Sequence, residues 1–325
     1  MRIGMIGTGW VAPQHLDALA LVSGAELVAV AGRDVAKAEA LARPRKAVPY
    51  GDWQAMLAAE RLDAVYVCLP PHIAATVARG CAGKVRGVMV EKPVASDVAD
   101  AELAARAFAE AGTIAGAAYH NRTRAMVGRI RALCATTLPV FAEAWWHGDM
   151  PGPPWWRNRA QSGGQMTEQC THLVDLLRLW LGEAVAVTAV ATQGVMRREV
   201  ADFDVDDALG ATIQFATGAI ACVHTSCVAL SGQQIDGVGL TLRARGWEAR
   251  LSGWGLDARI RRTDGTEEVL AAEPDAFRRQ AEAFVAAVTA GDPARLPCTY
   301  ADGLATLRLT RAIDRAAATG QPQRL

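Results

Sequence analysis

Short apolar runs alternate with amphipathic stretches through the first 120 residues. Several runs are rich in Val, Ile, Ala and Met on both faces, as are strands buried in a parallel sheet: Arg2–Ile6, Leu27–Ala31, Ala64–Cys68, Gly87–Val90 and Thr113–Ala117. Between them the pattern predicts helices over Val35–Ala42, Trp53–Glu60, Ile73–Ala82 and Asp97–Ala111. This alternation is typical of right-handed βαβ units, so we predict a doubly wound, Rossmann-type parallel sheet.

The pattern changes after Arg122. It predicts a helix near Thr123–Leu133, a strand over Val140–Trp146, a Pro-, Trp- and Gly-rich loop over His147–Gly164 and a long helix over Met166–Leu181. Strands then follow without helices between them: Ala186–Thr192, Ala208–Phe215, Ala219–Cys227, Gly239–Ala244 and Ala258–Arg262. Thr217-Gly218 and Asp264-Gly265 indicate hairpin turns, and helices near Asp275–Thr289 and Tyr300–Ala318 follow. This order predicts a C-terminal α/β domain with a large, mainly antiparallel sheet.

A chain of 325 residues is long enough for two cores. We expect an NAD(P)-binding domain over 1–120 and a substrate-binding and oligomerisation domain over 121–325, without a flexible linker, and the final helix is a candidate for packing back on the first domain. Lys and Arg together number 34, as do Asp and Glu, so the formal net charge is zero. Nucleic acids and anionic membranes select basic proteins, so neither is expected as a partner.

Seven cysteines are scattered without a Cys-x-x-Cys pair, which argues against a zinc ribbon or a redox dithiol and is typical of a reducing compartment. Three possible metal ligands lie close together in the sequence, at Cys222, His224 and Cys227. A fourth ligand is missing and the segment is a predicted strand, so no metal site is expected. A glycine turn already follows by residue 9, too early for a signal peptide, and the apolar runs are too short to span a bilayer. We therefore expect a cytoplasmic protein.

A glycine-rich loop follows the first predicted strand and precedes a helix. Its sequence, Gly7-Thr8-Gly9-Trp10-Val11-Ala12, has the form G-x-G-x-x-A. The glycines allow a tight turn and close approach of the backbone to a pyrophosphate, and the helix N-terminus offers N–H groups to that anion. We therefore predict that residues 7–11 bind a dinucleotide.

The end of the second predicted strand bears on the choice between NAD and NADP. An acidic residue there accepts a hydrogen bond from the ribose of NAD, whereas an arginine favours the 2′-phosphate of NADP. Gly32 occupies the usual acidic position and Arg33 follows it, which favours NADP. Asp34 keeps NAD open, since a shift of one residue would place it on the ribose; its alternative role is to cap the next helix.

Two polar features are candidates for the chemistry. Glu91-Lys92-Pro93 follows a buried strand at the sheet edge where doubly wound folds bind ligands, so Lys92 is placed to stabilise a reacting oxygen. In the predicted helix Met166–Leu181, four polar residues recur at helical spacing: Gln165, Glu168, His172 and Asp175. This stripe indicates either a cleft that contains His172 or a solvated helix face.

These motifs resemble the glucose–fructose oxidoreductase/inositol dehydrogenase (Gfo/Idh/MocA) family along nearly the whole chain. Glu91-Lys92-Pro93 and the segment from Gly163 to Asp175 are the most specific elements. The resemblance implies hydride transfer between a nicotinamide and a carbinol of a sugar, sugar derivative or cyclitol. It also implies that Lys92 and His172 flank the reacting carbon.

The sequence departs from the family pattern in two places. Glu168 and Cys170 stand where the family usually has Asp and Gly, which puts the position of the substrate in doubt more than the reaction type. The family's Thr-Pro-x-x-x-His turn is altered to Leu69-Pro70-Pro71-His72-Ile73-Ala74. Leu69, Pro70 and His72 remain candidates for cofactor contact, as does Glu91; His72 either replaces the family's histidine or simply begins a helix.

We expect His172 to act as general base on the substrate hydroxyl, because the pKa of histidine lies nearest working pH. Lys92 would hydrogen-bond the same oxygen, and Glu168 would orient Lys92 or a neighbouring hydroxyl. The resemblance also places the residues after the fifth strand near the nicotinamide and substrate, where Tyr119 lies; Asn121 is a candidate for cofactor binding and Arg122 for substrate binding.

Four tryptophans near the Pro-rich loop are candidates for packing on a sugar ring: Trp145, Trp146, Trp155 and Trp156. We expect Trp155 and Trp156 to bind substrate, although core or interface positions are the alternative. Other polar residues of the loop are candidates for hydroxyl or carboxylate binding or have no assigned role: His147, Asp149, Arg157, Asn158 and Arg159.

Two other functions remain open. Some relatives keep the nicotinamide bound and use transient oxidation for elimination or glycoside cleavage, and a non-catalytic NAD(P)-binding sensor would keep the same fold. The broad sheet of the second domain also predicts a homodimer or homotetramer, because a monomer would leave one face uncovered.

Overall fold

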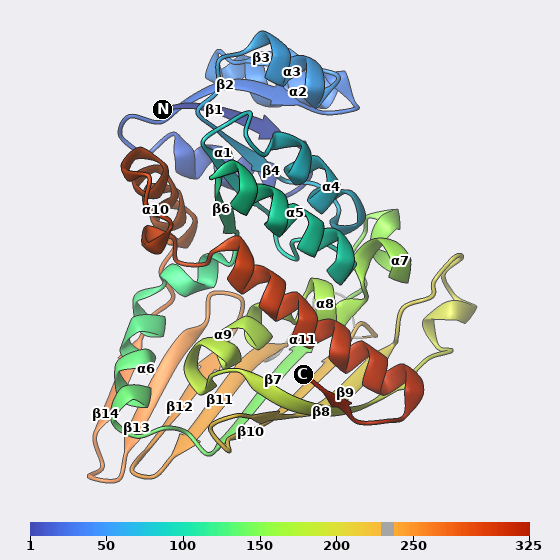
Figure 1. The fold of residues 1–325 in the computed structure, drawn as a ribbon. Coiled ribbons are helices and arrows are strands. Elements are labelled where there is room, and N and C mark those ends of the chain that lie inside the picture. The colour runs from blue at the N-terminus through green and yellow to red at the C-terminus, as the bar shows by residue number, and fades with distance from the viewer. Residues whose placement is uncertain (229–236) are drawn as a thin grey trace. The chain divides into compact units, whose positions relative to one another are not determined.

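The structure, a computed structural model, describes residues 1–228 and 237–325 (Figure 1). The chain forms two compact units. Unit 1 comprises 1–123 and 275–304, and unit 2 comprises 124–274 and 305–325. Each unit has its own sheet and its own hydrophobic core.

Unit 1 contains a six-stranded parallel sheet in the order β3-β2-β1-β4-β5-β6. Its strands are β1 (Arg2–Ile6), β2 (Glu26–Ala31), β3 (Val48–Tyr50), β4 (Ala64–Val67), β5 (Gly87–Val90) and β6 (Ile114–Ala117). The predicted Rossmann-type sheet is confirmed. The order reverses direction at β1, and doubly wound sheets bind ligands at the carboxyl ends of the strands beside such a reversal. Only β3 was missed, since it has three residues and contains Pro49.

The helices of unit 1 either connect these strands or come from later in the chain. They are α1 (Ala12–Leu19), α2 (Val35–Ala42), α3 (Trp53–Ala59), α4 (Pro71–Cys81), α5 (Val98–Ala111) and α10 (Ala276–Ala290), with short 3₁₀ turns η1 (Arg43–Arg45), η2 (His120–Thr123) and η5 (Pro293–Arg295). Helices α1 to α5 connect the strands, whereas α10 comes from later in the chain.

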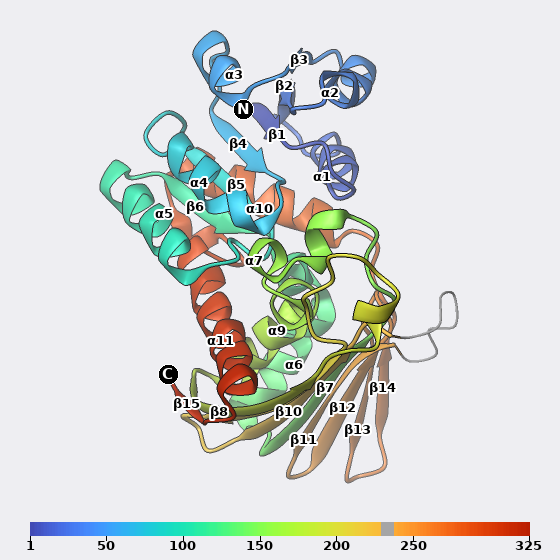
Figure 2. The same ribbon diagram turned by 90° about the vertical axis from the view of Figure 1, so that its right-hand side faces the viewer.

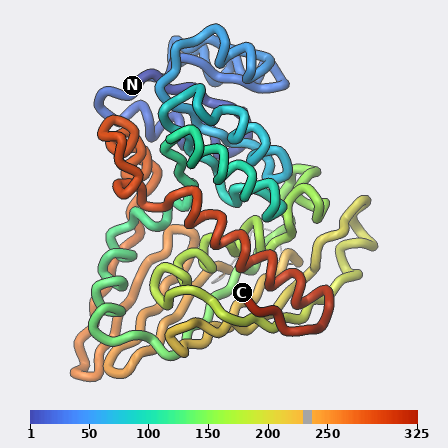
Figure 3. The backbone as a smooth tube through the Cα atoms, in the orientation of Figure 1, coloured from blue at the N-terminus to red at the C-terminus, as the bar shows by residue number. Residues whose placement is uncertain are grey.

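Helix α10 belongs to unit 1, although the sequence assigned its residues to the second domain (Figure 3). Its apolar face enters the core of the parallel sheet, where the rings of Phe284 and Tyr66 make an edge contact with centroids 5.3 Å apart. Val288 also packs so closely on β5 that a Cβ at Gly87 would lie 2.3 Å from its Cγ2. This burial explains why the segment 275–304 folds with unit 1.

Unit 2 contains a nine-stranded sheet in the order β14-β13-β12-β11-β7-β10-β9-β8-β15. Its strands are β7 (Phe141–His147), β8 (Ala184–Thr192), β9 (Ala208–Phe215), β10 (Ile220–Ser226), β11 (Val238–Ala244), β12 (Trp247–Ser252), β13 (Asp257–Arg262), β14 (Glu267–Leu270) and β15 (Gln323–Arg324). Within the described ranges β7 and β10 pair in parallel and the other neighbours are antiparallel, so the predicted sheet type is confirmed. Strands β12, β14 and β15 were not predicted.

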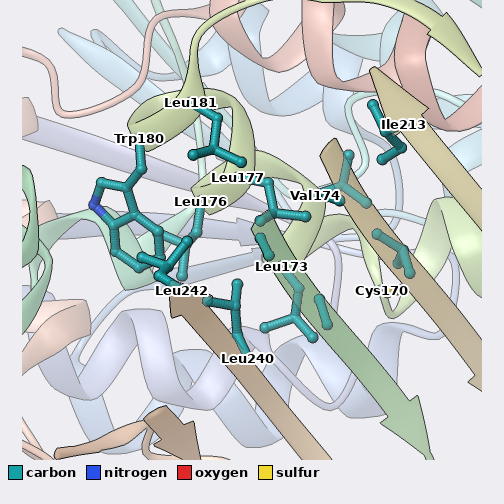
Figure 4. Packing of buried hydrophobic residues seen from close by; sticks show 14 of the residues in the cluster. Cys170, Leu173, Val174, Leu176, Leu177, Trp180, Leu181, Ile213, Leu240 and Leu242 are labelled. Carbon is teal, nitrogen blue, oxygen red and sulfur yellow. The ribbon is translucent and has the colours of Figure 1, made fainter. Parts of the chain in front are cut away.

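Helices α6 (Ala125–Thr136), α9 (Thr171–Leu181) and the unit-2 part of α11 (Tyr300–Thr319) lie on one face of this sheet (Figure 2). Short helices precede or follow the strands: η3 (Pro154–Arg157), α7 (Arg159–Ser162), α8 (Gln165–Glu168) and η4 (Met196–Arg198). Figure 4 shows Leu173 and Leu176 of α9 close to Leu240 and Leu242 of β11 in the main core. The opposite sheet face carries the alternate, partly exposed residues.

No helix in the described ranges has the length and apolar character needed to cross a bilayer.

Candidate active site

The glycine loop of unit 1 has the shape that a dinucleotide requires. Gly7 has φ +115°, and a Cβ there would lie 2.0 Å from the carbonyl oxygen of Cys68, so only glycine fits. At Gly9, by contrast, a Cβ would meet no described atom within 4 Å, which leaves the loop open for close approach of a ligand. Val11 precedes α1 without a side-chain cap, whereas the N–H of Ala12 donates to the carbonyl of Gly9 at 3.1 Å. The predicted residues Thr8 and Trp10 lie in the same loop, and the Trp10 side chain is 74% exposed.

The end of β2 lies against this loop. A Cβ at Gly32 would lie 2.7 Å from Cγ2 of Thr8, which explains the small residue at the usual acidic position. Arg33 is exposed, and Asp34 caps α2 by accepting a 3.2 Å hydrogen bond from the backbone N–H of Lys37. The capping role considered for Asp34 is therefore present, which leaves its carboxylate committed to the helix.

Lys92 follows β5 at the ligand-binding edge of the sheet and is partly buried. The preceding Glu91 carboxylate is buried and has two protein contacts: 2.7 Å to Nε2 of His15 and 2.9 Å to the backbone N–H of Lys92, which donates to it. His15 lies on α1 and packs against Tyr66 and Phe277. Glu91 thus connects the segment of Lys92 to the helix that follows the glycine loop. His15 was not predicted as a site residue, although it falls on the buried face of α1.

Leu69, Pro70 and His72 follow β4, at the same edge of the sheet as the glycine loop. Pro70 precedes α4, and its carbonyl accepts hydrogen bonds from the N–H groups of Ile73 and Ala74. His72 therefore lies in the first turn of α4, as the helix-start interpretation requires. Cofactor contact by these residues stays a prediction.

Asn121 and Arg122 lie in η2, after β6, and Tyr119 just before it is buried. The guanidinium of Arg122 donates to the carbonyl of Pro297 at 3.2 Å and lies 3.7 Å from the carboxylate of Asp302. Arg122 therefore has partners inside unit 1, and substrate binding by it stays a prediction.

The predicted long helix Met166–Leu181 is wrong in detail, because the chain forms two helices, α8 and α9. The N–H groups of Gln169 and Cys170 both donate to the carbonyl of Gln165, at 3.0 and 3.1 Å, which makes a wide turn between the helices. Before α8, Gly163 and Gly164 have φ +82° and +90°. Gln165, Glu168, His172 and Asp175 are therefore not one stripe of a regular helix.

The interpretation of this segment as a solvated face is also wrong. Gln165, His172 and Asp175 are less than 5% exposed. The Gln165 amide donates to the carbonyl of Ser226 at 2.9 Å, and Asp175 accepts from the hydroxyl of Thr306 at 2.9 Å. Gln165 and Asp175 are thus structural links, whereas His172 stacks on Trp146 of β7 with ring centroids 6.2 Å apart.

Helix α11 fixes the turn before α8 through a buried polar cluster. The Asp314 carboxylate accepts from the Thr167 hydroxyl at 3.0 Å and from Arg311 at 2.9 Å, and Arg311 also donates to the carbonyl of Gly163 at 3.1 Å. Burial raises the pKa of Asp314 to about 6, against the opposing effect of Arg311. The position of α8 thus depends on residues nearly 150 positions later in the chain.

Trp156 was expected to bind substrate, but it does not present a face to it. Its ring is fully buried with Phe203, Val205 and Cys227. Its indole N–H instead donates to the carboxylate of Glu168 at 3.0 Å. Trp155 is partly buried and packs against the same small cluster, so the loop forms a core of its own.

The alternation of β7 separates the two remaining candidate tryptophans. Trp146 is buried on the helix-covered face, whereas Trp145 lies on the opposite face and stacks on His224 at 6.4 Å. His147 contacts His224 on that face at 3.0 Å between Nε2 and Nδ1, and burial and the charge of His224 lower the pKa of His147. Trp254 was missed by the sequence analysis and packs edge-on against Trp146 at 5.3 Å.

The other polar loop residues have structural contacts. Asn158 caps α7, Arg159 pairs with Asp206 at 2.8 Å, the carbonyl of Arg157 accepts from the N–H of Asp204, and Asp149 forms a β-bridge with Val228. In the described part of the chain no cluster of three or more His, Cys, Asp or Glu side chains could hold a metal ion.

Relatives and a solved structure match nearly the whole chain. The D-xylose 1-dehydrogenase (NADP+) 2 of Haloferax volcanii is 26% identical over 98% of both chains, and the inositol 2-dehydrogenase of Rhizobium meliloti is 26% identical over 98% of this chain and 97% of its own. A levoglucosan dehydrogenase solved with NADH superposes with a TM-score of 0.88 at 18% identity, over 100% of this chain and 98% of that chain; at this identity the match shows the fold.

Two family models match most of the chain. The model of the oxidoreductase family with an NAD-binding Rossmann fold matches residues 1–119, and that of the GFO/IDH/MocA C-terminal domain matches residues 128–252. Both halves confirm the resemblance that the motifs indicated. The chain therefore belongs to the Gfo/Idh/MocA family of NAD(P)-dependent oxidoreductases.

Proposed function

We propose that this protein is a dehydrogenase or reductase that transfers a hydride between a nicotinamide and a carbinol of a sugar, sugar derivative or cyclitol. The observation that carries the proposal is the pairing, within unit 1, of an open glycine loop after β1 with Lys92 at the end of β5. Both lie at carboxyl ends of parallel strands, where this fold binds its ligands. When bound, the nicotinamide supplies the hydride acceptor or donor.

The residues that would hold the dinucleotide are those of the glycine loop and the neighbouring strand ends: Gly7, Thr8, Gly9, Trp10, Val11, Arg33, Asp34, Leu69, Pro70, His72, Glu91, Lys92 and Asn121. We favour NADP, because Gly32 offers no carboxylate to the ribose at the usual acidic position and Arg33 is exposed next to it. NAD is the alternative. Glu91 acts through His15 and the backbone of Lys92, so its part is to position Lys92.

Three side chains have separate roles in the reaction of the substrate. His172 takes the hydroxyl proton in the oxidative direction, because an imidazole exchanges protons near neutral pH. Lys92 donates a hydrogen bond to the same oxygen and stabilises its developing charge. Glu168 orients Lys92 or a neighbouring hydroxyl, and the hydrogen bond from Trp156 restricts where its longer side chain can reach. Arg122 and Trp155 are further candidates for substrate contact.

The substrate class is supported by the relatives, which are named for D-xylose and inositol. A homodimer or homotetramer is supported by the sheet face of unit 2 that carries Trp145 and His224, since partly exposed aromatic rings there suit burial against a second copy. A cytoplasmic location fits the absence of a disulfide bond among the described residues.

The test is a screen of purified protein for reduction of NAD and NADP, followed by absorbance of the reduced nicotinamide. D-Xylose, myo-inositol, levoglucosan and acyclic D-glucitol form the panel. Substrate-dependent reduction is expected, faster with NADP. Tight nucleotide binding without net reduction would instead favour bound-cofactor chemistry, and no binding of either nucleotide would contradict the proposal.

A further inference from the structure

Trp254 is an exposed indole held in a fixed position. It lies in the turn between β12 and β13 and is 56% exposed. A scattered apolar side chain on a surface needs no explanation. Trp254, however, packs edge-on against Trp146 at 5.3 Å, and Trp146 in turn stacks on His172 at 6.2 Å. The exposed ring therefore ends a row of three aromatic rings that begins at the proposed base.

The turn that carries Trp254 is closely packed. Gly253 has φ +74° and its N–H donates to the carbonyl of Val238 at 2.9 Å. Leu256 adopts φ +58°, which is uncommon for a residue with a side chain, and is buried in the core of unit 2. A Cβ at Gly255 would lie 2.5 Å from Cβ of Ala272. These contacts set the direction of the turn, although it places a large apolar ring in water.

We propose that Trp254 is the aromatic wall of the substrate subsite and selects ring-shaped substrates. An indole offers a flat apolar face and a single N–H donor. The C–H face of a pyranose or a cyclitol is a matching flat surface, whereas an open-chain polyol cannot present one. Binding on Trp254, beside Trp146, would bring a ring substrate to the residues around His172. The inference rests on the proposed function, because it assigns the substrate side of the same site.

The test compares Trp254→Ala and Trp254→Phe with wild type, and with Leu21→Ala, a change at a 69% exposed apolar residue of unit 1. With D-xylose and myo-inositol, Trp254→Ala should raise KM about tenfold and leave kcat and the nucleotide Kd nearly unchanged. Trp254→Phe should restore most of the affinity. Leu21→Ala should match wild type, and thermal melting verifies that each variant folds.

Three results would overturn the inference. An unchanged KM for both ring compounds in Trp254→Ala, with wild-type turnover intact, would show that Trp254 does not contact the substrate. The proposed function would be unaffected by that result. If Trp254→Ala raised the KM for acyclic D-glucitol as much as for the ring compounds, Trp254 would not select ring-shaped substrates. If wild type binds nucleotide but neither turns over nor binds either ring compound, the proposed function and this inference fail together.

Discussion

The two units place their candidate site residues by different physical means. In unit 1 the topology of the parallel sheet positions the residues, since Gly7, Arg33 and Lys92 each follow the carboxyl end of a strand. In unit 2 the candidate residues are positioned by contacts between side chains. Glu168 is held by the buried Trp156, and the turn before α8 is held by Arg311 and Asp314 of α11.

This difference decides which kinds of substitution each site tolerates. A site that is positioned by the backbone is disrupted by a substitution whose Cβ has no room. A site that is positioned by side chains is disrupted when a hydrogen-bond donor or acceptor is removed. The second kind is also sensitive to pH, because it depends on buried ionisable groups such as Asp314. Substitutions in the two units should separate these two modes of failure.

The largest effect is expected at Lys92. Lys92→Ala should lower kcat about a thousandfold, because it removes the donor to the reacting oxygen, while the nucleotide Kd stays within a fewfold of wild type. Steady-state kinetics and nucleotide titration measure both. Lys84→Ala, at an exposed lysine of the same unit, is the control and should behave as wild type. Full activity in Lys92→Ala would remove the lysine from the mechanism.

Next is the pair of glycines in the loop. Gly7→Ala should lower the free energy of unfolding by on the order of 3 kcal/mol, because its Cβ collides with the carbonyl of Cys68 and its φ is unfavourable. Gly9→Ala should fold as wild type, since its Cβ has open space, and should weaken only nucleotide binding. Chemical denaturation and nucleotide titration distinguish the two. Equal stability losses would show that backbone space is not what the loop requires.

The pH dependence of stability should come from Asp314. Its pKa is about 6 in the fold against 3.8 as the ordinary value, so the folded state retains a proton that the unfolded state releases. Its contribution to stability is therefore full below about pH 4 and declines by roughly 3 kcal/mol as pH rises through 6.

Asp314→Asn stays neutral, so this decline should disappear from its denaturation curves between pH 4 and pH 7. Asp17→Asn, at an exposed carboxylate, should keep the wild-type slope. An identical pH slope in wild type and Asp314→Asn would contradict the assignment.

A smaller effect is expected at Trp156. Trp156→Phe keeps a buried ring but removes the N–H that Glu168 accepts, so kcat/KM should fall about tenfold with little change in nucleotide binding. Trp180→Phe is the matched control, since it removes an indole hydrogen bond to Val127 in the same unit without touching Glu168. If both variants lose activity equally, Trp156 acts through packing alone.

An effect of similar size is expected at Arg33, confined to NADP binding. Arg33→Ala should weaken NADP binding by about tenfold and leave NAD binding unchanged, because only NADP carries a 2′-phosphate. Isothermal titration with both nucleotides measures the ratio. An NADP affinity that stays the same in Arg33→Ala would favour NAD as the cofactor, with Asp34 on its ribose.

The sequence was most informative where local patterns determine structure. The predicted bounds of β1 and β5 match the structure, and the glycine loop and Lys92 follow directly from them. The break between α8 and α9 could not be predicted, because Met166–Leu181 has a continuous helical pattern, and the contacts that hold α8 and the turn before it come from α11.

The same limit applies to the tryptophans. A cluster of four suggested a substrate-binding loop, but Trp156 became core and Trp145 fell on the opposite sheet face. His15 and Trp254 carried no local signal that distinguished them from ordinary buried or surface residues. Their significance comes from Glu91 and Trp146, which are far from them in sequence.

The central proposal assigns Lys92 as the hydrogen-bond donor to the reacting oxygen and His172 as the general base. The most direct test measures kcat for wild type, Lys92→Ala, His172→Asn and the double variant with the ring substrate that reduces NADP or NAD fastest. Each single change should cost about a thousandfold, and the double should lose no more than about tenfold beyond the slower single. Independent, multiplied losses, or full turnover in either single variant, would contradict the account.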